Sequence, residues 1–219
     1  MKKTLLVILI SMLTFVGKSY AEMTYGVSLA LTKINAEGSE FEGGEENVQK
    51  NLVHYVPIPS LFVEYGFNDK ISIGLDYIPL NADVSDKTKT RNDTETSVTG
   101  DNDKTTTARA QSAQAELKNH VTLYSNYMLN DTTYIKAGMA YVSLETGESL
   151  ATGSTYGNAD IFGGVIGVGA KQGNSRFELV YTNYEEITLT SSVARTGVTG
   201  NNKLEAELDT VAFKYSYAF

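Results

Sequence analysis

The sequence predicts an all-β protein: an eight-stranded antiparallel up-and-down β-barrel that spans a membrane and is preceded by a cleaved signal peptide. Residues 210–219 place large apolar or aromatic side chains at every second position, and a period of two is typical of a β-strand. The first 21 residues have the composition of an export signal, and the connections between the predicted strands alternate between long and short. We therefore divide the chain into a signal peptide, 1–21, and a barrel domain, 22–219.

The signal peptide is predicted from three parts. Lys2 and Lys3 form a short basic start, residues 5–16 are an almost unbroken apolar run, and Ala21 is the small residue that a signal peptidase requires. The apolar run of 12 residues is too short for a membrane-spanning helix, which needs about 20 residues. The chain has no cysteine, so an exported fold must be stabilised by burial and hydrogen bonding instead of disulfides.

Charge and aromatic content narrow the class of protein. Removing the signal peptide, which carries three lysines and no acid, takes the net charge from −8 to −11. Such an acidic chain lacks the basic surface that nucleic-acid binding needs. The 14 tyrosines and 8 phenylalanines suit the aromatic girdles of a membrane barrel, which here must form without tryptophan.

Alternating side chains define the strands in chain order. The first strand is predicted over 25–32, and the strongest hairpin follows, with strands 60–67 and 70–77 joined by a tight turn at Asn68 and Asp69. Prolines flank this hairpin where pairing is expected to end, because proline has no N–H to donate; they are Pro57, Pro59 and Pro79. Five further strands are predicted at 117–129, 133–144, 160–170, 176–189 and 210–219.

The connections predict the topology. The short ones are 68–69, 130–131 and 171–175, and the long polar ones are 34–55, 81–115, 146–158 and 191–203. Outer-membrane barrels have short periplasmic turns and long outer loops, so this alternation predicts periplasmic N- and C-termini. We expect the long connections to be irregular, mobile surface loops, with 34–55 and 81–115 as the contact regions for an unidentified surface partner.

The mature chain resembles the small eight-stranded bacterial outer-membrane barrels of the OmpX, OmpW, opacity-protein and OmpA-barrel type. The strand 211–219, the hairpin 61–77 and the alternating connection lengths carry the resemblance. It implies a porin-like barrel in the outer membrane of a Gram-negative cell, surrounded by lipid and lipopolysaccharide and inserted by the barrel-assembly machinery. In that family a terminal strand ending in an aromatic residue is the assembly signal, and the matching residues here are Phe213, Tyr215, Tyr217 and Phe219.

Charged side chains share the inward-facing positions with small ones. These charged or titratable residues are Glu64, Asp76, His120, Lys136, Glu178 and Lys214. Eight strands enclose an interior that side chains just fill, and buried charges persist only when paired. We therefore expect a neutralising network that plugs the lumen, with a narrow polar pore as the alternative. Lys214 is expected to pair with Glu178 on the adjacent strand, or otherwise with Glu64.

The sequence contains no convincing catalytic, cofactor or metal-binding pattern. The two histidines, His54 and His120, have no serine partner at an evident spacing, and the acidic loops lack EF-hand spacing. We expect a non-enzymatic surface protein that acts in adhesion, surface interaction or envelope integrity. The alternatives are a narrow porin or OmpW-like conduit for small solutes and, third, an outer-membrane lipid-modifying enzyme.

Overall fold

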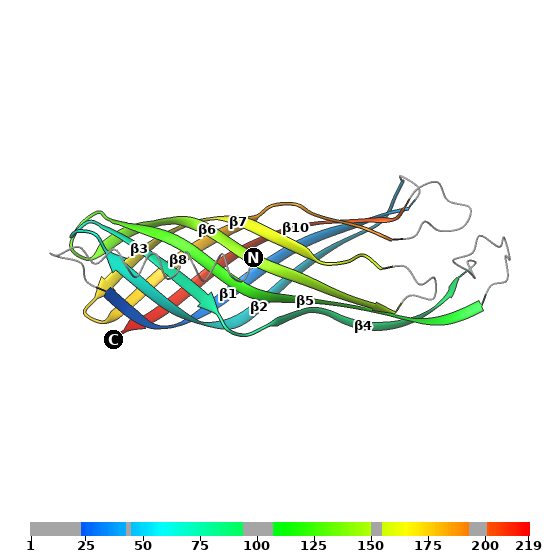
Figure 1. The fold of residues 1–219 in the computed structure, drawn as a ribbon, viewed down its shortest axis with the longest axis horizontal. Coiled ribbons are helices and arrows are strands. Elements are labelled where there is room, and N and C mark those ends of the chain that lie inside the picture. Colours follow the sequence, from blue (N-terminus) through cyan, green and yellow to red (C-terminus); the bar gives the residue numbers. More distant parts are fainter. Residues whose placement is uncertain (1–22, 43–44, 94–106, 150–154, 193–200) are drawn as a thin grey trace.

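The computed structural model describes residues 23–42, 45–93, 107–149, 155–192 and 201–219. These residues form ten antiparallel strands in one closed sheet (Figure 1). The predicted signal peptide lies outside the described residues. Within them, no helix is long and apolar enough to cross a membrane.

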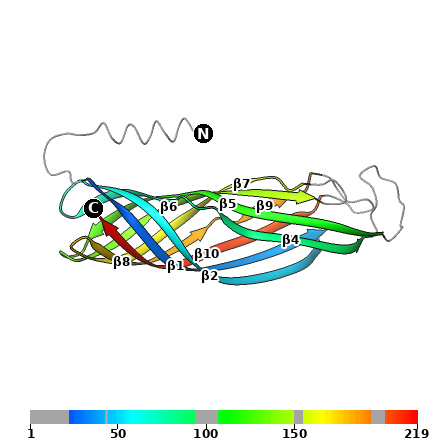
Figure 2. The ribbon, with the colours of Figure 1, turned by 90° about the horizontal axis from the view of Figure 1, so that it is seen from below.

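The strands follow one another around the barrel in chain order. Their bounds are β1 Met23–Glu42, β2 Glu45–Gly66, β3 Ile71–Ile78, β4 Ala82–Asp93, β5 Thr107–Met128, β6 Thr133–Ser149, β7 Ala159–Gln172, β8 Ser175–Tyr184, β9 Ile187–Thr190 and β10 Lys203–Ala218. β1 pairs with both β2 and β10, which closes the sheet (Figure 2).

Two positions around the barrel are each filled by two consecutive strands. β3 and β4 both pair with β5, one beyond the other, and β8 and β9 both pair with β10 in the same way. The predicted single strand 176–189 is therefore interrupted at residues 185 and 186. Ten strands thus make eight positions in the wall, which confirms the predicted eight-stranded antiparallel barrel.

The short turns and both ends of the described chain lie at the same end of the barrel (Figure 1). The side-chain oxygen of Asn68 accepts hydrogen bonds from the N–H groups of Lys70 and Ile71, both at 2.9 Å. Asn130 organises its turn in the same way, as expected for asparagine in tight turns. The N–H of Phe219 donates to the carbonyl oxygen of Tyr25 at 2.9 Å, so the last residue helps to close the wall.

The four long connections were expected to be irregular, and for most described residues of two of them, 34–55 and 81–115, this is wrong; residues 155–158 and 191–192 of the other two lie outside any strand. In the predicted loop 34–55, β1 continues to residue 42 and β2 begins at residue 45; in 81–115, β4 covers 82–93 and β5 begins at 107. Outside a membrane both faces of a strand meet water, so pairing can continue without apolar alternation. The predicted contact regions are therefore largely paired strands, while residues 94–106 lie outside the described part.

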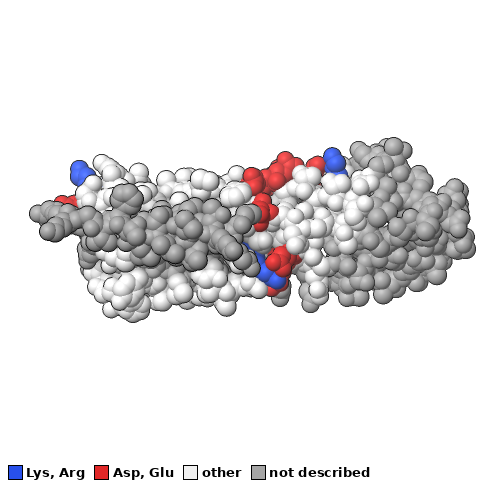
Figure 3. Space-filling model, in the orientation of Figure 1, with Lys and Arg blue, Asp and Glu red and all other residues white. Residues whose placement is uncertain are grey.

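An apolar belt surrounds the half of the barrel that carries the short turns. Its residues point outward and are exposed; they include Tyr25, Val27, Leu29, Leu31, Leu61, Val63, Tyr77, Leu123, Tyr127, Ile135, Met139, Phe162, Ile166, Val168, Phe177, Leu179, Tyr181, Val211, Phe213, Tyr215 and Tyr217. Where grey atoms do not cover it, Figure 3 shows this half white apart from a few charged residues at its turn end, with Asp and Glu gathered at mid-length. A closed barrel leaves no unpaired backbone toward lipid, so this half spans the membrane and the other half extends beyond it.

Candidate functional site

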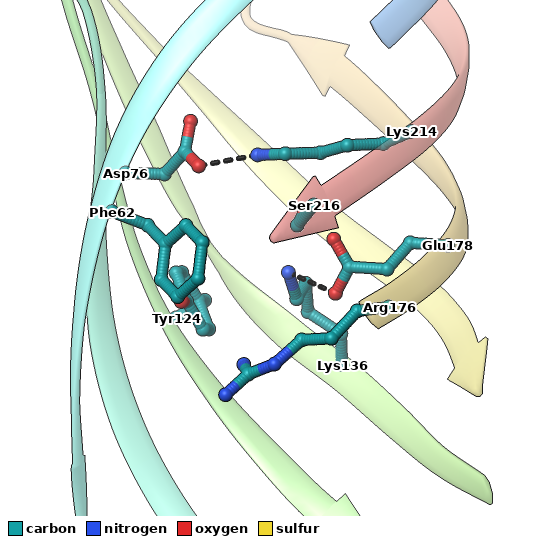
Figure 4. Close-up of a pocket in the computed structure, with 8 residues that line it drawn as sticks. All are labelled: Phe62, Asp76, Tyr124, Lys136, Arg176, Glu178, Lys214 and Ser216. Atoms are coloured by element: carbon teal, nitrogen blue, oxygen red, sulfur yellow. Dashed lines mark hydrogen bonds and ion pairs between the residues drawn. The ribbon is translucent and has the colours of Figure 1, made fainter. Parts of the chain in front are cut away.

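Six charged side chains from five strands meet inside the membrane-spanning half of the barrel, and Figure 4 draws all of them except Glu64. The three acids are Glu64, Asp76 and Glu178, and the three bases are Lys136, Arg176 and Lys214. They form three ion pairs, which we call the lumen network. Because the formal charges balance, the network carries no net charge into the membrane interior.

Glu64 of β2 has the most hydrogen-bond donors in the lumen network. Its Oε2 accepts from Nη1 of Arg176 at 2.7 Å, Nδ2 of Asn126 at 2.8 Å and the hydroxyl of Tyr124 at 3.2 Å. Glu64 itself is buried, with 9% of its surface exposed. A carboxylate in such a place is tolerated because its charge is paired and its oxygen is hydrogen-bonded.

The other two pairs join strands that are not neighbours in the wall. Lys214 binds Asp76, which also accepts a hydrogen bond from Ser60 at 3.2 Å. Lys136 binds Glu178. Glu178 also accepts a hydrogen bond from the Tyr134 hydroxyl at 2.8 Å.

The predicted pairing of Lys214 with Glu178 or Glu64 is wrong. Lys214 and Glu178 do occupy directly opposed positions on β10 and β8, as their similar depth suggested. Their side chains nevertheless bind partners on strands that are not adjacent to their own: Lys214 binds Asp76, and Glu178 binds Lys136 (Figure 4). Side chains on the inside of a closed wall point toward its axis, so a long lysine reaches the far strands as readily as its neighbour.

Arg176 was missing from the predicted inward set. It lies two residues before Glu178 on β8, at a position of the same parity, so continuing the alternation by one step would have found it. Its guanidinium carbon also lies 5.1 Å from the ring centre of Phe62. Lys136 similarly lies 4.0 Å from the ring centre of Tyr124, so both cations combine an ion pair with a cation–π contact.

Aromatic rings fill the lumen around the network, and a glycine on the adjacent strand makes room for each ring. Tyr124 lies directly opposite Gly74, and Tyr134 directly opposite Gly169. A Cβ added to either glycine would lie 2.3 Å from a ring carbon of its tyrosine. Two further pairs are arranged in this way: Phe62 with Gly26 and Tyr184 with Gly163.

His120 was predicted to belong to the charged network, but its hydrogen-bond partner is a phenol. Its Nε2 lies 2.7 Å from the hydroxyl of Tyr184, while its Nδ1 is buried without a hydrogen-bond partner. The preceding residue, Asn119, has a φ of 55°, and the pairing of β5 with β6 shifts register between Lys118 and Val121. This β-bulge changes the direction of β5 at the outer limit of the belt.

Beyond His120, toward the outer end, the lumen becomes apolar. A buried cluster of eight side chains fills it: Ala140, Val142, Leu144, Ile161, Val165, Tyr184, Ile187 and Leu189. We call this set the outer core. It was not predicted, because the assignment of inward positions concentrated on charged residues. The lumen therefore has two layers, a charged one near the short turns and an apolar one above it.

The packing leaves little free space between the ion pairs. A cavity of about 10 Å³ lies among Asp76, Lys136, Arg176, Glu178 and Lys214, room for about one water molecule. Within the described ranges, no group of three or more His, Asp or Glu side chains could hold a metal ion. The site is thus a packed, neutral plug.

The residues of the predicted assembly signal all face outward from β10. Phe213, Tyr215, Tyr217 and Phe219 are each at least 40% exposed and belong to the lipid-facing surface. Phe219 contacts the rings of Tyr25 and Tyr217, with centroids 6.0 and 5.5 Å apart. Their role in assembly stays a prediction.

No protein-family model matches the sequence, and no curated protein matches it. Among solved structures, the chain is similar to the outer membrane protein OprG from Pseudomonas aeruginosa, with 11% identity, a TM-score of 0.45 and coverage of 89% of this chain and 96% of that one. The outer membrane protease OmpT from Escherichia coli has 11% identity, a TM-score of 0.46 and coverage of 90% and 96%.

The outer membrane protein AlkL, solved in lipid bilayers, has 12% identity, a TM-score of 0.45 and coverage of 93% of each chain. These identities and TM-scores are low, so the type of barrel is argued from the strand pairing and the surface of this chain itself. The ladder from β1 around to β10 closes without a free edge in the belt, the belt is apolar outside, and the lumen is neutral inside. The chain is a small eight-stranded up-and-down β-barrel of the outer-membrane type.

Proposed function

We propose that the protein is a membrane anchor that holds paired strands above the outer membrane for contact with a surface partner. The observation that carries this proposal is the continuation of the strands beyond the belt. β1 stays paired with β2 from Met23 to Glu42, although its exposed apolar residues end at Leu31. Eleven more residues of paired strand, at about 3.3 Å each, raise the β1–β2 hairpin well clear of the lipid.

A trimmed variant tests this role. Replacing residues 37–51 with a two-residue turn removes the raised hairpin where Ala36 and Leu52 lie opposite each other, and leaves the belt intact. We expect a normal amount of folded, heat-modifiable barrel and reduced retention of expressing cells on a matrix-coated surface. Retention equal to that of the full chain would contradict the proposal.

The lumen network supports an anchor more than a channel. Paired charges and aromatic rings surround a cavity of about 10 Å³, room for about one water molecule. We expect no unitary conductance from the purified barrel in planar bilayers. The double variant Tyr124→Ala with Tyr134→Ala, which removes two of the rings, is the matched control for a lumen that can open. Steady conductance by the unaltered chain would favour the porin alternative.

The orientation in the membrane is part of the proposal: short turns and termini in the periplasm, raised hairpin outside. The chain has no cysteine, so single substitutions report position cleanly. We expect an impermeant maleimide to label His54→Cys on intact cells and to label Asp69→Cys, in a short turn, only after the outer membrane is opened. The reverse pattern would invert the topology.

We further propose that the protein is not an enzyme. His54 is exposed on β2, and His120 is bonded to Tyr184 inside the lumen, so the two are held on separate surfaces. Lipid A from cells with and without the protein should give the same mass spectrum. A new or missing acyl chain that depends on either histidine would support the third alternative, a lipid-modifying enzyme.

A further inference from the structure

Above the belt, β2 has one edge that no described strand pairs. β2 pairs with β1 from residue 45 to residue 65, but with β3 only from 61 to 66. β4, which continues the position of β3 in the wall, pairs with β5. Figure 1 shows β1, β2 and β10 running together beyond the belt, apart from β4 and β5. We call residues 52–56 on this side the β2 edge.

The backbone direction along β2 follows from the hairpin. The N–H of Phe67 donates to the carbonyl oxygen of Ile71 at 2.9 Å. Because N–H and C=O groups alternate between the two sides of a strand, the odd-numbered residues of β2 direct theirs toward β3. On the β2 edge, Val53 and Tyr55 therefore direct their backbone groups away from β1 and into the open side.

Prolines explain why pairing stops at this point. Pro57 and Pro59 belong to the odd-numbered set and have no N–H to donate. The register that places Leu61 opposite Tyr77 would next place Pro59 opposite Pro79, so neither could donate to the other. All three prolines of the chain lie at this junction, and they keep β2 and β4 from joining.

The β2 edge is apolar and unguarded. Leu52, Val53 and Tyr55 are 48%, 55% and 62% exposed, so both faces of the strand are open to water. Residues 51–60 contain no Lys, Arg, Asp or Glu. Natural sheets protect exposed edges with charges, prolines, bulges or covering segments, because an open edge is a template for another strand. The prolines at 57 and 59 lie next to the β2 edge and not within it.

We propose that the β2 edge binds an extended segment of a partner polypeptide, which adds antiparallel to β2 and continues the β2–β3 ladder outward. This rests on the proposed surface function, whose partner it describes: a strand with apolar side chains to lie beside Val53 and Tyr55. A polypeptide backbone supplies donors and acceptors together, which a lipid chain does not. Two upright copies in one membrane would present their β2 edges in parallel, the less stable pairing.

Hydrogen exchange of the full-length protein in lipid vesicles tests the proposal. The probe is a synthetic peptide of residues 31–42, the sequence that already pairs with β2 on its other side. Without peptide, the amides of Val53 and Tyr55 should exchange fast, while those of Leu52 and His54, directed to β1, are protected. Saturating peptide should slow the first two at least about tenfold, as expected when an open amide gains a strand partner.

Three variants keep the test specific. Val53→Pro removes a donor from the β2 edge and should weaken peptide binding at least about tenfold, whereas Val53→Thr keeps the N–H and should not. Pro59→Thr combined with Pro79→Thr restores donors, so β4 should close the edge and protect both amides without peptide.

Three results would overturn strand addition. Protection of Val53 and Tyr55 in the unaltered chain would show an edge closed by β4, protection that rises with protein concentration would show a second copy, and exchange unchanged by saturating peptide would show no strand binding. None of these affects maleimide labelling of His54→Cys or the retention assay, so failure here remains distinct from failure of the surface role.

Discussion

The two layers of the lumen both fill the barrel interior, the lumen network with paired charges and the outer core with apolar side chains. Near the short turns, inward positions hold three ion pairs with hydrogen-bonding phenols and an amide; farther out, they hold the apolar outer core. Both layers are bounded by the same closed ladder. In the outer core each side chain contributes mainly by its own burial, whereas each charge in the network depends on a specific partner. The network should therefore be the less tolerant layer.

The largest expected effect comes from breaking one ion pair. Lys136→Met leaves the buried Glu178 carboxylate with the Tyr134 hydroxyl as its remaining strong partner, and should lower the free energy of unfolding by about 3 to 5 kcal/mol. Urea unfolding from lipid vesicles measures it. Adding Glu178→Gln should recover much of the loss, because the uncompensated charge is then gone. A double variant as unstable as the single one would mean that packing, not charge, is lost.

A double-mutant cycle, which compares two single variants with the double variant, distinguishes the observed partner of Lys214 from the predicted one. Lys214→Met should couple more strongly with Asp76→Asn than with Glu178→Gln, because the ion pair joins Lys214 to Asp76. Coupling to Asp76 below about 0.5 kcal/mol would indicate that the network is screened by water.

Truncation in the outer core should cost somewhat less. Ile161 is 1% exposed, and Ile161→Ala should lower the free energy of unfolding by about 2 to 4 kcal/mol through lost burial and the cavity left behind. Ile161→Val should cost about 0.5 to 1.5 kcal/mol. Here no second substitution is expected to rescue the variant, in contrast to the ion pairs; rescue by a change of charge elsewhere would break the comparison.

A glycine substitution tests whether the aromatic rings are held against the opposing strand. Gly169→Ala places a methyl group where the Tyr134 ring lies, and should cost about 1 to 3 kcal/mol of the free energy of unfolding. Gly164→Ala is the matched control on the same strand, because nothing lies within 4 Å of its added Cβ. Equal stability of the two variants would mean that the rings are not held against the opposing strand.

The smallest effect is expected outside the belt, where water surrounds the ions. A hydrogen bond from Lys118, at 2.8 Å, lowers the pKa of Glu116 below its usual 4.5. A lowered pKa in the fold means that this pair stabilises the protein above the usual pKa and that its contribution is lost as pH falls through the folded value. Carboxyl NMR titration should show the Glu116 pKa return toward 4.5 in Lys118→Met, with little change in melting temperature. A large loss of stability would contradict the screening argument.

The outer segments show where sequence patterns stop being informative. Apolar alternation marked β1 as far as residue 32 because lipid demands it there, and lost the strand once both faces met water, although pairing continues to Glu42. The three prolines, in contrast, were correctly expected to mark the end of pairing between β2 and β3. A proline has no N–H to donate to a neighbouring strand, whether that strand faces lipid or water.

The sequence by itself determined the features that depend on neighbouring residues. Alternation showed which side of each strand faces lipid, Asn68 and Asn130 marked two of the tight turns, and parity placed Glu64, Asp76, Lys136, Glu178 and Lys214 on the inward side of their strands. Each of these follows from local backbone geometry.

Only the tertiary structure decided which side chains meet. Closure of β1 on β10 brings Lys214 to Asp76, 138 residues away in sequence, and sets Tyr124 over Gly74. The outer core likewise forms only when inward positions of β6, β7, β8 and β9 converge. These contacts depend on the curvature and register of the whole wall, which no single strand specifies.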